Sequence, residues 1–74
     1  MIERLSRRER EVLELLAGGR RYKEIASSLG ISESSVNVYV RRAMAELEAD
    51  TPTQAAVILA SEAGRTAGER LAGR

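Results

Sequence analysis

Hydrophobic positions along the chain recur every three or four residues in four separate stretches, the spacing of amphipathic α-helices. The stretches span Val12–Leu16, Ile25–Leu29, Val36–Leu47 and Ala55–Leu59. No stretch shows a clear period-two alternation that would mark a half-buried strand, and the sequence contains no internal repeat. The pattern therefore predicts an all-α protein, a four-helix bundle whose core is made from one face of each helix.

Short signals for helix ends separate these stretches. Ser6-Arg7-Arg8-Glu9 fits a capping box at the start of the first helix, and Gly18-Gly19 is suited to end it. Gly30 is expected to end the second helix, and Ser32 can cap the third. The charges at 6–11 are expected to be solvated and to form pairs such as Arg7–Glu11.

The last part of the chain divides at about Ala63. Thr51-Pro52 places a cap before a proline, so we expect a fourth helix from Pro52 to about Ala63. The residues after it contain three glycines and no sustained apolar stripe, which predicts a flexible or partly helical tail. We therefore expect a helix-turn-helix domain over residues 1–63 and a tail over 64–74.

The tight break between the second and third helices predicts a helix-turn-helix, whose second helix enters the major groove of DNA. Gly30 permits the turn, Ile31 can fill the space under it, and Ala26 permits a close helix crossing. When the apolar stripe of the third helix faces inward, its opposite face presents groups suited to DNA. The residues predicted to read bases are Ser34, Asn37, Val38 and Arg41.

The chemistry of these residues fits base edges. Asn can form paired hydrogen bonds with adenine, Arg can bind guanine or phosphate, and valine methyl groups can contact the methyl group of thymine. A second set is expected at phosphates, which determine position rather than sequence; the plain alternative is that its charges only solvate the surface. This second set comprises Arg20, Arg21, Lys23, Ser35 and Arg42.

The stretch LSRREREVLELLAGGRRYKEIASSLGISESSVNVYV resembles the DNA-binding domain of LuxR/FixJ-type (GerE-like) bacterial transcription regulators. The similarity runs from Leu5 to about Leu59. It implies a LuxR-type four-helix domain whose third helix reads the major groove and whose fourth helix pairs two copies. By position, the resemblance places Asn37, Val38 and Arg41 at bases, and Lys23, Ser35 and Tyr39 at the DNA backbone.

Three positions depart from that family, which usually has lysine, histidine and lysine where this chain has Asn37, Tyr39 and Glu46. Losing basic groups weakens the electrostatic share of DNA binding. Tyr39 can equally pack its ring at the edge of the core. The stretch VRRAMAELE also resembles the promoter-reading domain of sigma factors. The alternative function is therefore a protein-interaction module that docks on a sigma factor, RNA polymerase or another regulator, with weak or partner-dependent DNA binding.

Charge and composition sharpen this picture. The 74-residue chain has a net charge of +1, but residues 20–42 carry a net +3 and residues 46–63 a net −4. Such a polarised surface is typical of an anion-binding face with an acidic back. The chain has no histidine and no cysteine, so we expect no enzyme activity, no metal and no cofactor.

Small apolar residues on the fourth helix predict a surface for a partner. Two-fold pairing through this helix would match two-fold half-sites in promoter DNA; an alanine surface that needs no partner is the plain alternative. We therefore expect a homodimer that pairs through the fourth helix. The N-terminus lacks the apolar segment of a signal peptide and no apolar run could span a membrane, so we expect a cytoplasmic protein. The residues expected between the two copies are Ala56, Leu59, Ala60 and Ala63.

Overall fold

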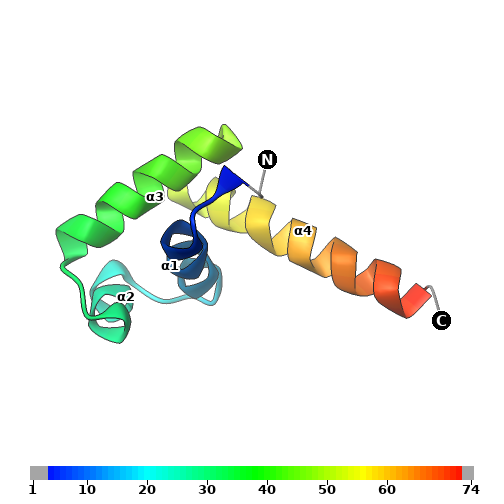
Figure 1. Cartoon of the computed structure of the whole chain (residues 1–74), viewed down its shortest axis with the longest axis horizontal. Coiled ribbons are helices and arrows are strands. Elements are labelled where there is room, and N and C mark those ends of the chain that lie inside the picture. The colour runs from blue at the N-terminus through cyan, green and yellow to red at the C-terminus, as the bar shows by residue number, and fades with distance from the viewer. Residues whose placement is uncertain (1–3, 73–74) are drawn as a thin grey trace.

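The computed structural model describes the backbone of residues 4–72 and the side chains of residues 4–62. The helices are α1 (Arg7–Ala17), α2 (Tyr22–Leu29), α3 (Glu33–Leu47) and α4 (Pro52–Ala72). No strand occurs among residues 4–72, and the predicted all-α fold of four helices is confirmed. Helix α1 packs against each of the other three, and α3 contacts both α2 and α4 (Figure 1).

Helices α1 and α4 begin where their capping residues predict. The Ser6 hydroxyl accepts a hydrogen bond from the Glu9 N–H, and the Glu9 carboxylate accepts one from the Ser6 N–H, both at 3.1 Å. The Thr51 hydroxyl accepts a hydrogen bond from the Gln54 N–H at 3.0 Å at the start of α4. These bonds satisfy N–H groups that have no partner within the helix.

Helix α2 begins at Tyr22, three residues before the first buried residue of its apolar stretch, Ile25. Arg21 lies at the N-cap and has no side-chain oxygen to offer. Instead, the Glu24 carboxylate accepts a hydrogen bond from the Arg21 N–H at 2.9 Å. Helix α2 therefore has one of the two hydrogen bonds of a capping box, the bond from the N-cap N–H to the carboxylate three residues later.

The turn of the helix-turn-helix depends on Gly30. Its φ of 68° and ψ of 35° are left-handed, and the N–H of Ile31 donates to the Ala26 carbonyl at 3.0 Å. The chain then enters α3, where the Ser32 hydroxyl caps the helix by accepting from the Ser35 N–H at 3.0 Å. Left-handed backbone ends one helix and redirects the chain within a few residues.

The core consists of two hydrophobic clusters that meet along α1. The α2-side cluster joins α1, α2 and α3 through buried residues that include Val12 and Ile25. The α4-side cluster joins α1, α3 and α4 through residues that include Leu13 and Leu59. Val12 and Leu13 are consecutive, so their side chains leave α1 about 100° apart and enter different clusters.

Helix α3 is held along its length by the apolar stripe that its sequence predicts. Val36 and Val40 belong to the α2-side cluster, whereas Ala43 and Leu47 belong to the α4-side cluster. All four are at most 2% exposed. Burying a Val or Leu side chain contributes about 1.5–3 kcal/mol, so the stripe holds both the position and the rotation of α3.

Helix α4 continues to Ala72, beyond the expected end at about Ala63. Its first half covers the core with Ala55 and Leu59, and its second half extends past the other three helices (Figure 1). Side chains after residue 62 lie outside the described part of the chain. The division into a domain over 1–63 and a tail over 64–74 therefore stays a prediction.

Gly30 and Glu48 provide a matched test of backbone strain, because both adopt left-handed φ angles, of 68° and 55°. A Cβ at Gly30 would meet no atom within 4 Å, so Gly30→Ala adds backbone strain alone. We expect it to lower the free energy of unfolding by about 1–2 kcal/mol. Glu48→Gly removes the same kind of strain and is expected to raise that free energy by up to about 1 kcal/mol, since glycine also loses more entropy on folding. Urea unfolding measures both, and two changes of the same sign would contradict this account.

Candidate nucleic-acid interface

The side of α3 opposite its buried stripe is open to solvent. Ser34, Val38, Arg41 and Arg42 are exposed, and Asn37 is half-buried beside them. Spacings of three and four residues place these side chains on one side of the helix. The structure thus brings all the predicted base-reading residues, together with Arg42, onto one surface, which we call the α3 face.

Val38 is an exposed apolar residue in the centre of this polar surface. It is 45% exposed, and among the described side chains only Val57, at 56%, is a comparably exposed large hydrophobic residue. Single exposed apolar residues are ordinary on protein surfaces. The position of Val38, between serine, asparagine and arginine side chains, makes its methyl groups available to whatever contacts that face.

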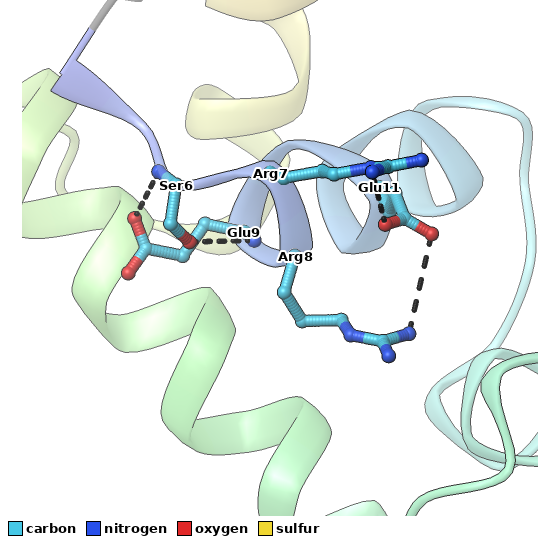
Figure 2. Close-up of polar contacts among 5 residues, drawn as sticks. All are labelled: Ser6, Arg7, Arg8, Glu9 and Glu11. Atoms are coloured by element: carbon cyan, nitrogen blue, oxygen red, sulfur yellow. Dashed lines mark hydrogen bonds and ion pairs between the residues drawn. The ribbon is translucent and has the colours of Figure 1, made fainter.

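The basic residues of the chain divide into paired and unpaired groups. Arg7 Nε and Arg8 Nη1 lie 3.9 Å and 4.0 Å from the Glu11 carboxylate oxygens, and Figure 2 shows both side chains meeting that carboxylate. This confirms the predicted Arg7–Glu11 pair. Within the described residues, no ion pair involves the predicted DNA-binding cations Arg20, Arg21, Lys23, Arg41 and Arg42.

Tyr22 brings the start of α2 near the α3 face. Its half-buried ring packs against the α2-side cluster. Burial raises the pKa of the Tyr22 phenol, and the positive charge of Arg41 partly opposes this increase. The residues that flank Tyr22 in the chain, Arg21 and Lys23, are exposed, as is Arg41 on α3.

Ser35 and Tyr39, both predicted at phosphates, are only partly exposed. The Ser32 hydroxyl donates to the Ser35 hydroxyl at 3.0 Å, which leaves the hydrogen of Ser35 free to donate to another acceptor. The Tyr39 ring packs against the α2-side cluster, as its packing alternative predicted. Contact of its hydroxyl with phosphate stays a prediction.

A shallow groove lies between the last turn of α1 and the first half of α4. Of the residues expected between two copies, Ala60 is exposed, whereas Ala56 and Leu59 are only 6% and 4% exposed. Leu59 packs inside the α4-side cluster and offers almost no surface to a partner; the side chain of Ala63 lies outside the described residues. The groove is lined by Leu16, Ala17, Thr53, Ala56, Val57 and Ala60.

Sequence reasoning missed two residues of these surfaces, Tyr22 and Val57. Glu24, three residues after Arg21, is the capping signal that could have placed Tyr22 inside α2. Val57 lies within the run AAVILA, where every residue is apolar, so hydrophobic periodicity could not separate its inner from its outer side. Packing against α1 and α3 decides that Val57 faces outward.

The described residues include no group of three or more side chains that could hold a metal ion. Glu9 is 8% exposed, and its carboxylate is used by the capping box. None of the helices in the described part of the chain is long and apolar enough to cross a membrane.

Comparison with known proteins finds a matching family and several related chains. The profile of the family described as bacterial regulatory proteins, luxR family (GerE), matches residues 3–59. The chain is 47% identical over 55 residues to the spore germination protein GerE of Bacillus subtilis (strain 168), a match that covers 74% of each chain. It is also 47% identical over 53 residues to the uncharacterized transcriptional regulatory protein YhcZ of the same strain, covering 72% of this chain.

Some of these relatives are much longer than the matched region. The match to YhcZ covers 25% of that protein. The match to the transcriptional activator protein CarR of Pectobacterium carotovorum subsp. carotovorum is 46% identical over 44 residues, which is 60% of this chain and 18% of CarR. The chain therefore spans about a quarter or less of these two relatives.

The raised pKa of Tyr22 predicts how stability responds to alkaline pH. The phenol ionises near pH 10 in the unfolded chain and at higher pH in the folded chain. Its contribution to the free energy of unfolding is therefore fully present below about pH 10 and is lost as pH rises through the folded-state pKa. We expect Tyr22→Phe to lose less stability than the parent between about pH 9 and 11, measured by urea unfolding. A loss of stability in Tyr22→Phe equal to that of the parent over this pH range would contradict the assignment.

Proposed function

The chain belongs to the luxR family of bacterial regulatory proteins, and we propose that it regulates transcription by binding double-stranded promoter DNA through the α3 face. The single observation that carries this proposal is the α3 face itself. It is exposed, it contains no acidic residue from Ser34 to Arg42, and it carries two arginines without ion pairs among the described residues. The major groove of DNA is wide enough to admit one α-helix.

Within the groove, we assign each side chain a role from its chemistry. Arg41 donates to O6 and N7 of guanine, and Asn37 forms paired hydrogen bonds with N6 and N7 of adenine. Val38 contacts the methyl group of thymine. Ser34 lies in the first turn of α3, where its short hydroxyl side chain can hydrogen-bond to a base. The exposure of these residues on one face supports the assignment.

The charges around α3 would hold the DNA backbone. Arg21, Lys23 and Arg41 are exposed and α2 packs against α3, so cations from both helices would contact the same duplex. Ser35 has a free hydroxyl hydrogen for a phosphate oxygen. We assign phosphate contacts to Arg20, Arg21, Lys23, Ser35, Tyr39 and Arg42.

The groove between α1 and α4 would hold a second copy of the chain. Val57 provides exposed apolar surface there, and the small side chains of Ala56 and Ala60 leave room for a partner helix. Two copies related by a two-fold axis would present two α3 faces to half-sites one helical turn apart. This pairing replaces Leu59 with Val57 as the principal apolar contact.

Measurements of DNA affinity and base preference test whether the α3 face reads DNA. Duplexes selected from a random pool should bind the parent, with an affinity that falls steeply as salt rises. Arg41→Ala and Asn37→Ala should each lose preference at one separate base position, at a cost of about 1–3 kcal/mol. Arg7→Ala removes an arginine that already pairs with Glu11 and should leave base preference unchanged.

Two results would reject this assignment. Unchanged base preference in both Arg41→Ala and Asn37→Ala would show that another surface reads the DNA. Absence of duplex binding even at low salt, combined with retention of a protein partner from nuclease-treated extract, would favour the docking module on a sigma factor or RNA polymerase instead.

Analytical sedimentation of the parent and of a variant with an added charge tests the proposed dimer. Val57→Arg should raise the dimer dissociation constant about tenfold or more, because pairing would bury an unpaired charge. Ser28→Arg adds the same charge at an exposed position of α2, which contributes no residue to the groove, and should leave dimerisation unchanged. A parent that stays monomeric at all concentrations, with DNA present or absent, would contradict the proposed pairing.

A further inference from the structure

The outward side of α3 changes character along its length. Ser34, Val38, Arg42 and Glu46 follow one another at intervals of four residues, so each lies beside the next in a row that turns gradually around the helix. Along this row the first residue is polar, the second apolar, the third basic and the fourth acidic. Glu48 ends the helix immediately afterwards and is also exposed.

The carboxylate of Glu46 is not neutralised by its neighbours. Arg42 lies one helical turn before it, a spacing that permits an ion pair, yet Arg42 and Glu46 form none. Glu46 is half-buried and Glu48 is exposed, so both present negative charge at the end of the surface that the proposed function assigns to DNA. We call these two residues the acidic end of α3.

We infer that Glu46 and Glu48 weaken binding of the α3 face to any duplex by repelling DNA phosphates, so that only a duplex with the correct base contacts stays bound, an inference that rests on the proposed function. Repulsion at this end lets α3 approach the groove with Ser34, Val38 and Arg41 while its last turn stays farther from the duplex. The attraction of cations to phosphates supplies essentially all of non-specific binding. A duplex that also offers the correct base contacts keeps an additional source of affinity, whereas a duplex without them has only the weakened attraction.

The repulsion has a recognisable dependence on salt. Exposed charges interact strongly at low ionic strength and are screened as salt is added, with a Debye length of about 10 Å at 0.1 M. Removal of a repelling carboxylate should therefore raise affinity most at low salt and make the fall of affinity with salt steeper. A change in the fold would lower affinity instead, so the direction of the effect separates the two.

The experiment compares Glu46→Gln, Glu48→Gln and Glu14→Gln for binding to a selected duplex and to a random duplex over a range of salt. Glu14 is an exposed acid on α1, so its replacement changes net charge by the same amount away from α3. We expect each of the first two variants to bind random duplex about two- to fivefold more tightly at low salt than Glu14→Gln does. The double variant should stay bound to random duplex at salt concentrations that release the parent.

The outcomes separate this inference from the proposed function. If the parent binds duplex and Arg41→Ala loses base preference, but the Glu46 and Glu48 variants match Glu14→Gln at every salt concentration, the inferred repulsion is overturned and the proposed function stands. If the parent binds no duplex at low salt, the proposed function itself fails. Tighter binding of the Glu46 and Glu48 variants, greatest at low salt, supports the inference.

Discussion

The candidate interface depends on the burial of one apolar stripe of α3. Val36 and Val40 are enclosed by α1 and α2, while Ala43 and Leu47 are enclosed by α1 and α4. Because the stripe is packed at both ends, α3 can neither rotate nor tilt without opening one of the clusters. The opposite side of the helix is exposed as a consequence, and its short, polar and basic side chains are presented as a rigid surface rather than as a flexible loop.

Much of this arrangement follows from local signals. Ser6, Ser32 and Thr51 satisfy N–H groups a few residues ahead in the sequence, so their effect does not depend on the rest of the fold. Gly30 is similarly local, since left-handed backbone is inexpensive only for glycine. The stripe of α3 has a single helical phase, and that phase alone predicts which residues face outward.

Other features depend on packing between distant segments and could not be predicted in this way. The run at 55–60 is apolar on every side, so only contact with α1 and α3 decides that Leu59 faces inward and Val57 outward. The effect of the Arg41 charge on the pKa of Tyr22 joins two helices separated by the turn, and no spacing within either helix reveals it. Spacing predicted the Arg7–Glu11 pair, but the same four-residue spacing between Arg42 and Glu46 gives no ion pair, because side-chain placement decides that outcome.

Leu16 has a position whose consequence extends across the molecule. Its side chain packs against both hydrophobic clusters and also lines the groove beside α4. Anything seated in that groove would press on a residue that supports α2 and α3 from behind. If the proposed pairing changes DNA affinity through Leu16, reciprocity requires DNA binding to change the affinity of pairing by the same factor.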